Sequence, residues 1–267
     1  MGIKERLVVI GNGMAGVATV EHLLAKREDM EITIFGSEPY TNYNRVLLSS
    51  VLSGEVGLDN ITLNPLNWYH EKGIELHLGS SVNHINTKEK TVITDVGDVY
   101  PFDKLLIATG SHAFIPPIKG MQTTGKLKSG IFTFRNLDDT RSMINWAQKC
   151  RKAIVIGGGL LGLEAARGLI RQGMDVTVAH LMDRLMEMQL DAAAAQILKK
   201  EITKLGIQVL LKHCAEEIIG DDCIEGLRFT NGKIHDADMI VIAAGIRPNV
   251  RLAEEAGLVV NNGIVVD

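Results

Sequence analysis

Two glycine-rich loops, each placed between a short apolar run and a helix-like stretch, constrain this chain more than any other feature. The first, Gly11-Asn12-Gly13-Met14-Ala15-Gly16, follows residues 7–10, and the second, Gly157-Gly158-Gly159-Leu160-Leu161-Gly162, follows residues 154–156. Both have the G-x-G-x-x-G spacing of a dinucleotide-binding turn between a strand and a helix. One such loop would say little. A matched pair indicates two nucleotide cofactors held close together so that electrons pass between them.

The composition is that of a soluble α/β protein and excludes several partner classes. Of 267 residues, 46% are hydrophobic, 27 are glycines, and the formal net charge is −4. A slightly acidic chain lacks the basic surface expected for nucleic-acid binding. Asn12, Glu21 and His22 interrupt the apolar stretch 7–24, so we expect neither a membrane span nor a signal peptide there. The three cysteines form no C-x-x-C pair, which favours a reducing, cytoplasmic compartment.

The apolar pattern predicts the same order of elements twice, beginning at each glycine loop. Short runs of β-branched residues predict strands buried in a parallel sheet. Apolar residues at helical spacing follow each loop and predict a helix there. In the first half we expect strands at 7–10, 31–35, 74–78, 91–93 and 104–108, with a helix at 14–27. In the second half we expect strands from 152, at 175–179 and at 239–243, with helices at 160–172 and 191–205.

Two stiff segments divide the chain into two Rossmann-like α/β domains. Pro116-Pro117 with Gly120 forms one crossing, and Arg247-Pro248-Asn249 forms the other. We therefore expect a second domain at 119–245, inserted into a first domain made of residues 1–118 and 246–267.

The chemistry of each loop assigns a role to its glycines. The first glycine permits the tight turn, the second lets a pyrophosphate approach the backbone, and the third lets helix and strand pack closely. The helix N-terminus then stabilises the phosphate charge. The fingerprint normally continues to an acid that binds the cofactor ribose, and in the first half Glu38 holds that place, with Ser37 as the alternative. Glu38 could equally be an exposed loop carboxylate.

In the second half, His180 ends the strand where an NAD-preferring site usually carries an acid. A neutral imidazole can bond a 2′-hydroxyl, whereas a protonated one would attract a 2′-phosphate. We expect modest discrimination between NADH and NADPH, with NADPH gaining as the pH falls; a histidine that only fills the strand end is the alternative. Glu164 lies near the start of the following helix, where the helix dipole favours a carboxylate, and it could also face the nicotinamide.

Other catalytic and metal-binding arrangements are missing from the sequence. Residues 1–149 contain no cysteine, so no thiol from this part can stand beside a flavin. Cys214 and Cys223 have no companion at a zinc-binding spacing, and the eight histidines form no H-x-x-x-H pair. We predict no metal site, no dithiol-mediated reductase and no hydrolase.

These motifs resemble those of the two-dinucleotide-binding flavoprotein superfamily, in which FAD and NAD(P)H occupy paired Rossmann domains. More narrowly, the chain resembles the N-terminal reductase portion of the large subunit of NAD(P)H-dependent nitrite reductases over its full length. The motifs that carry the resemblance are Gly11–Gly16, Ala108–Ser111, Gly157–Gly162 with Glu164, residues 243–249, Asn42–Ser50, Phe132–Arg135, His180–Met182, Leu185–Glu187 and Gln189–Asp191.

The resemblance implies a role for each candidate site residue. FAD would occupy the domain of residues 1–118 and 246–267, and NAD(P)H the domain of residues 119–245. Arg45 would lie near the phosphate or flavin, although without the resemblance it is simply a loop charge. For FAD the implied residues are Gly11, Gly13, Ala15, Gly16, Ser37, Glu38, Arg45, Val82, Ala108, Thr109 and Gly110. For NAD(P)H they are Gly157, Gly159, Leu160, Leu161, Gly162, Glu164 toward the nicotinamide, His180 toward the ribose, and Gly245.

The resemblance also implies a reaction and its rivals. NAD(P)H would pass a hydride to FAD, and electrons would then reach the iron–sulfur and sirohaem modules of a nitrite reductase. One alternative acceptor is a carrier protein, as in rubredoxin or ferredoxin reductases; another possibility is a non-catalytic nucleotide-binding module or redox sensor. The chain stops at Asp267, before the superfamily's third FAD motif and C-terminal domain. We therefore expect a truncated fold that retains FAD weakly.

Overall fold

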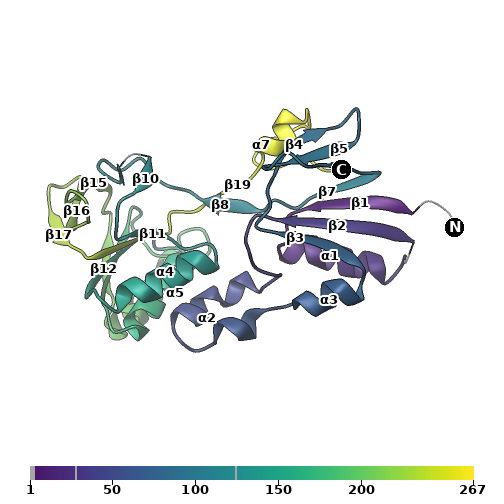
Figure 1. Cartoon of the computed structure of the whole chain (residues 1–267). Coiled ribbons are helices and arrows are strands. Elements are labelled where there is room, and N and C mark those ends of the chain that lie inside the picture. Colours follow the sequence, from purple (N-terminus) through teal and green to yellow (C-terminus); the bar gives the residue numbers. More distant parts are fainter. Residues whose placement is uncertain (1–3, 28, 124) are drawn as a thin grey trace. The chain divides into compact units, whose positions relative to one another are not determined.

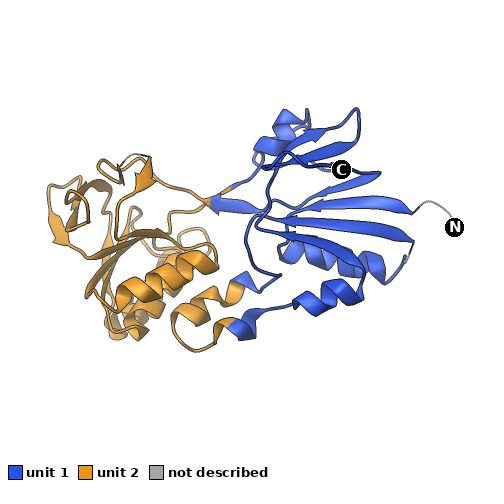
Figure 2. Cartoon of the chain, viewed as in Figure 1, with its two compact units in different colours: residues 1–45, 59–112, 248–267 blue, residues 46–58, 113–247 orange. Residues whose placement is uncertain are grey.

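The computed structural model describes residues 4–27, 29–123 and 125–267 (Figure 1). The chain divides into two compact units (Figure 2). Unit 1 contains residues 1–45, 59–112 and 248–267. Unit 2 contains residues 46–58 and 113–247.

Unit 1 is built on a four-stranded parallel sheet of order β3-β2-β1-β7. Leu7 and Val9 of β1 face α1 and α3, while Val8 and Ile10 face an antiparallel meander and α7. This alternation follows from the two-residue period of a strand. The sheet comprises β1 (Glu5–Ile10), β2 (Met30–Gly36), β3 (Ile74–Leu78) and β7 (Lys104–Ile107); the meander comprises β4 (Val82–Asn86), β5 (Thr91–Thr94) and β6 (Val99–Pro101). The helices are α1 (Met14–Leu24), η2 (Leu58–Ile61), α3 (Leu66–Glu71) and α7 (Arg251–Glu255), and η1 (Arg45–Leu47) begins the excursion into unit 2.

Unit 2 repeats this plan with a five-stranded parallel sheet of order β11-β18-β12-β13-β14. One face packs against a second antiparallel meander through Ile154, Ile240 and Phe229. On α5, Leu163, Ala166 and Leu169 are buried against the sheet strands. The strands are β9 (Gln122–Thr123), β10 (Lys126–Leu127), β11 (Ile131–Thr133), β12 (Lys152–Ile156), β13 (Asp175–His180), β14 (Gln208–Leu211), β15 (Ala215–Ile219), β16 (Gly226–Phe229), β17 (Ile234–Asp236) and β18 (Met239–Ile242). The helices are α2 (Leu48–Leu52), α4 (Leu137–Ala147), α5 (Leu160–Arg171) and α6 (Ala192–Lys204).

The two units therefore share one topology. Strands β1, β2, β3 and β7 correspond in order and pairing to β12, β13, β14 and β18. In both units the meander is the connection between the third and fourth of these strands. The predicted α/β class and the duplicated strand–turn–helix–strand plan are confirmed.

The unit boundaries differ from the predicted domain ranges. The chain changes unit after residue 112 and again after residue 247, rather than at 118/119 and 245/246. Both crossings are short strands, β8 (Ser111–Ala113) and β19 (Ile246–Pro248), which pair with each other. Prolines 116 and 117 follow β8, so the stiff segment lies a few residues beyond the crossing.

A larger difference concerns residues 46–58, which belong to unit 2 although the sequence placed them in the first domain. Their helix α2 packs on α5, where Leu52 lies against Gly168 and is fully buried. The Gln172 side chain donates to the Leu52 carbonyl at 2.7 Å, and Arg167 pairs with Glu55 at 2.6 Å. A long-range contact of this kind has no local sequence signal, which is why the prediction missed it.

Substituting Gly168→Ala should destabilise the chain. A Cβ at this position would lie 2.7 Å from Leu52 Cγ and 3.2 Å from its Cβ. Overpacking costs about 1–3 kcal/mol, more than the roughly 1 kcal/mol gained from alanine's helix propensity. We expect the melting temperature to fall by about 3 °C in thermal denaturation. In a Leu52→Ala background only the 3.2 Å approach to the Cβ of residue 52 remains, so the same substitution should destabilise the chain much less. Equal effects in both backgrounds would contradict this packing.

Candidate functional site

The first glycine loop is pressed against the end of a neighbouring strand. Gly11 has φ +118°, and its N–H donates to the Phe35 carbonyl at 2.8 Å. A Cβ on Gly11 would lie 2.2 Å from the Ala108 carbonyl oxygen, and one on Gly16 would lie 2.4 Å from the Gly11 oxygen. A Cβ on Gly13 would meet nothing within 4 Å. Gly11 and Gly16 are therefore required by the fold, whereas Gly13 leaves an open face.

The second loop has the same geometry. Gly157 has φ +125°, and a Cβ there would lie 2.2 Å from the Ala243 carbonyl oxygen. A Cβ on Gly162 would lie 2.1 Å from the Gly157 oxygen, and Gly159 again faces open space. Close packing at the Cβ does not require glycine at positions 13 and 159, and the close approach of a ligand gives a physical reason for it.

Each loop ends at a helix N-terminus suited to an anion. Gly13 and Gly159 are the N-caps of α1 and α5, and neither helix has a side-chain cap. The first N–H groups of a helix lack intrahelical partners and lie at the positive end of its dipole. Ala15 and Leu160 are exposed in these first turns, and Leu161 is half-buried. Both loops can thus cradle a pyrophosphate.

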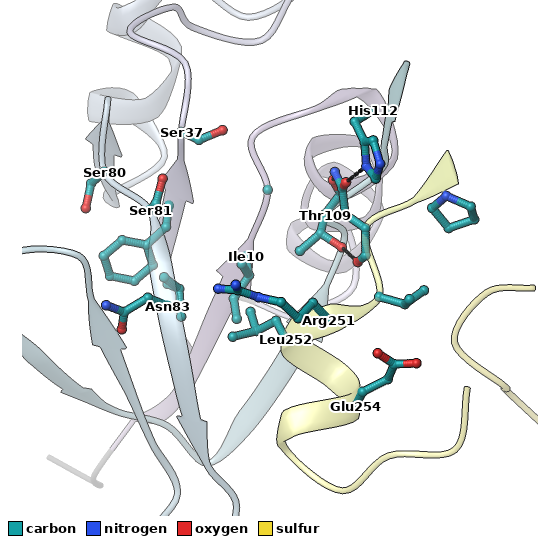
Figure 3. Close-up of a pocket in the computed structure, with 16 residues that line it drawn as sticks. Ile10, Ser37, Ser80, Ser81, Asn83, Thr109, His112, Arg251, Leu252 and Glu254 are labelled. Atoms are coloured by element: carbon teal, nitrogen blue, oxygen red, sulfur yellow. Dashed lines mark hydrogen bonds between the residues drawn. The ribbon is translucent and has the colours of Figure 1, made fainter. Parts of the chain in front are cut away.

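Unit 1 contains a cavity of about 460 Å³ at the carboxyl ends of β1 and β2 (Figure 3). This is where open parallel sheets bind ligands, and the volume lies in the usual range for small-molecule sites. Four predicted residues line it: Gly11, Ser37, Val82 and Thr109. No site role was assigned from the sequence to the other polar lining residues, which are Ser80, Ser81, Asn83, His112, Asn249, Arg251 and Glu254.

Among these, Asn249 secures the small-residue turn 108–110. Its side-chain amide donates to the Thr109 carbonyl at 2.7 Å, and the Thr109 hydroxyl donates to the Asn249 carbonyl at 2.7 Å. The Asn249 N–H also donates to the Gly110 carbonyl at 2.9 Å, and Gly110 has φ +65°. A ring nitrogen of His112 lies 2.6 Å from Asn249 Oδ1. In the sequence, Asn249 was noted as part of a crossing and of a motif that carries the resemblance, but it was assigned no site role; its place after the second small-residue turn was the available signal.

Glu38, the predicted ribose acid, is engaged by neighbours on its own loop. The Tyr43 hydroxyl donates to Glu38 at 2.6 Å, and Arg45 forms an ion pair with the same carboxylate. The Arg45 guanidinium also lies 4.9 Å from the centre of the Tyr43 ring. The roles of Glu38 and Arg45 toward FAD stay predictions, but the two predicted residues lie together. Tyr43, which joins them, was missed.

A buried polar network supports the first loop from behind. The Tyr69 hydroxyl donates to Asn12 Oδ1 at 2.8 Å, and the Asn42 side chain donates to Asn64 at 2.8 Å. The pKa of Tyr69 is raised above its usual range, chiefly because the phenol is buried. Asn42 Oδ1 is buried without a hydrogen-bond partner among the described residues. This network fixes the position of Asn12 between the two loop glycines.

In unit 2 the predicted residues gather around the second loop. His180 is buried at the end of β13, and its Nδ1 accepts the N–H of Gly158 at 3.0 Å. Glu164 lies half-buried in the first turn of α5. Gly245 has φ +114° and accepts a hydrogen bond from the N–H of Phe114 at 2.9 Å. The roles of these residues toward NAD(P)H stay predictions.

Neither a metal site nor a membrane span emerges from the described residues. Across 4–27, 29–123 and 125–267, no three His, Cys, Asp or Glu side chains gather as metal ligands. No helix in these ranges is both long and apolar enough to cross a bilayer.

Comparison with known protein families decides what the paired loops represent. Residues 5–267 match the model of the pyridine nucleotide-disulphide oxidoreductase family. The chain belongs to this family. The suspected superfamily and the predicted FAD and NAD(P)H cofactors are therefore supported, and the open faces at Gly13 and Gly159 fit these dinucleotides.

Relatives narrow the position of the chain within the family. It is 50% identical to the "Nitrite reductase [NAD(P)H]" of Bacillus subtilis over 99% of its length and 32% of that protein's. It is 47% identical to the "Assimilatory nitrate reductase electron transfer subunit" of the same organism, covering 34% of it. The chain thus spans about a third of these relatives. The fold matches the reductase in the putidaredoxin reductase–putidaredoxin complex at a TM-score of 0.92 and 25% identity, covering 99% of this chain and 64% of that one.

The contrast between Gly13 and Gly16 makes a testable prediction about the first loop. Gly13→Ala should leave the melting temperature of the FAD-free chain unchanged but weaken FAD binding about tenfold, because the methyl group occupies the open face. Gly16→Ala should lower the melting temperature, because its Cβ meets backbone. Gly159→Ala, a matched change in the second loop, should leave FAD affinity unchanged. Thermal denaturation and FAD fluorescence titration measure these effects. Unaltered FAD affinity in Gly13→Ala would show that no phosphate approaches there.

Proposed function

We propose that this chain is a reductase module that binds NAD(P)H and FAD, passing reducing equivalents from the first to the second and then to a separate acceptor. The observation that carries the proposal is that the two units of this chain have the same glycine-loop geometry. The chain also belongs to a family of oxidoreductases. Two equivalent pyrophosphate cradles suit two dinucleotides. A protein that only sensed one nucleotide would have no use for the second.

The residues of the chain would bind and orient rather than exchange protons. When bound, FAD supplies a ring that accepts a hydride from reduced nicotinamide and releases electrons singly. The N-termini of α1 and α5 would neutralise the two pyrophosphates. Ser37, Val82 and Thr109 would line the FAD site, and Glu164 would face the nicotinamide. The absence of a catalytic acid–base pair among the predicted site residues fits a reaction in which cofactors carry the chemistry.

The names of the relatives support a proposed acceptor. Similarity to a nitrite reductase and to a nitrate reductase electron transfer subunit favours iron–sulfur and sirohaem centres of a nitrite reductase. Similarity to the reductase bound to putidaredoxin supports a carrier protein as the second candidate. A cytoplasmic location is also part of the proposal, and the three free cysteines, Cys150, Cys214 and Cys223, are consistent with a reducing compartment.

Anaerobic spectroscopy tests the reductase step directly. The chain, reconstituted with FAD, should show a protein-bound flavin spectrum that bleaches on addition of NADH or NADPH. Gly159→Ala should retain the flavin spectrum but require about tenfold more NAD(P)H for the same bleaching rate, because its methyl group faces the second phosphate site. Ferricyanide added afterwards should restore the spectrum. Bound flavin that neither coenzyme bleaches would favour the non-catalytic module.

A further inference from the structure

If NAD(P)H binds in unit 2 as proposed, residues near the end of β13 would contact the ribose 2′ position of the coenzyme. In parallel register, Ile10 pairs with Phe35 in unit 1, and Ile156 pairs with Ala179 in unit 2. His180 follows Ala179 and therefore stands at the strand end, next to the second glycine loop. An acid near this end normally bonds the ribose 2′-hydroxyl. His180 is not an acid, so the negative charge must come from elsewhere or be absent.

Both ring nitrogens of His180 are already used. The N–H of Gly158 donates to Nδ1 at 3.0 Å, and Nε2 lies 2.9 Å from Glu187 Oε2. Because Nδ1 accepts a backbone N–H, the ring proton is on Nε2 and is donated to Glu187. A second proton, on Nδ1, would point at the Gly158 N–H and cost that hydrogen bond. Nδ1 and Nε2 are thus both engaged within the protein, and neither is left to contact the 2′-phosphate of NADPH.

The carboxylate of Glu187 supplies the missing charge. Its side chain is 24% exposed, and its Oε1 has no hydrogen-bond partner among the described residues. The basic side chain of the same loop, Arg184, is directed to the Leu190 carbonyl and to Asp183, each at 3.4 Å. Glu187 thus keeps an uncompensated charge and a free acceptor oxygen beside the strand end.

The loop that carries Glu187 is fixed to the glycine loop. The N–H of Met186 donates to the Gly158 carbonyl at 3.0 Å, and Met186 has φ +52°. Leu185 is fully buried, and its Cδ2 would lie 2.7 Å from a Cβ on Gly158. The carboxylate is therefore held at a set position relative to the pyrophosphate cradle.

We propose that Glu187, positioned by His180, determines coenzyme choice in this chain. Its free oxygen accepts a hydrogen bond from the 2′-hydroxyl of NADH, and its charge repels the 2′-phosphate of NADPH. The chain therefore prefers NADH.

Equilibrium binding, followed by the fluorescence of NADH and of NADPH, tests the proposal without requiring FAD or turnover. The wild-type chain should bind NADH at least about tenfold more tightly than NADPH. Glu187→Gln should weaken NADH and strengthen NADPH, which brings the two dissociation constants within about threefold. Glu187→Arg should reverse the preference. His180→Phe, which removes the positioning hydrogen bond, should narrow the ratio without reversing it.

Glu201→Gln is the matched control, because the exposed Glu201 side chain pairs with Lys204 on α6 and the substitution changes the net charge by the same amount. It should leave both dissociation constants unchanged, and thermal denaturation should show each variant folded. A ratio unaffected by Glu187→Gln, in a chain that binds both coenzymes, overturns the role of Glu187 alone. A wild-type chain that binds neither coenzyme overturns the proposed function as well.

Discussion

The contact on which both candidate sites depend is the close approach of a glycine to a carbonyl on the neighbouring strand end. Gly11 meets the carbonyl of Ala108 and Gly157 meets that of Ala243, in each case closer than any side chain allows. This approach turns the backbone sharply enough for a helix to start at the sheet edge. The bare N–H groups at that start then face the position of a ligand. Without this contact neither loop would present an anion site, whatever residues surrounded it.

The residue after the first glycine of each loop packs against the end of the neighbouring strand, and the two units fill this space with different residues. In unit 1 the loop carries Asn12 and the strand end carries Gly36, where a Cβ would lie 2.9 Å from Asn12 Cβ. In unit 2 the sizes are exchanged, because Gly158 faces the ring of His180, 2.7 Å from the position of a Cβ. Only one partner of each pair can be large. Packing against the histidine therefore explains the glycine at 158.

Much of this arrangement was predictable because its signals are local. Glycine spacing, β-branched runs and helical periodicity belong to short segments, so the two loops and most of the parallel strands were predicted, although β11 and β14 were not. What escaped prediction depends on distant pairs. Asn249 bonds a turn 140 residues earlier in the chain, and Leu52 packs against Gly168 in the other half of the sequence. Glu187 was noted only as part of a resemblance, since nothing in its own segment shows that it faces His180.

The two units also differ in the surroundings of the acidic residue near the glycine loop, which is Glu38 in unit 1 and Glu187 in unit 2. This difference suggests how one loop geometry serves two cofactors. Glu38 is neutralised by Arg45 and bonded by Tyr43, so its charge is largely satisfied within the loop. Glu187 is bonded by the ring of His180 and keeps one oxygen without a hydrogen-bond partner among the described residues. A carboxylate whose charge is compensated by a cation repels a nearby phosphate only weakly. An uncompensated carboxylate accepts a hydrogen bond from a hydroxyl group and repels a phosphate. Under the proposed assignment, the glycine motif binds a dinucleotide in each unit, and residues outside the motif select which one, because only they differ in charge between the units.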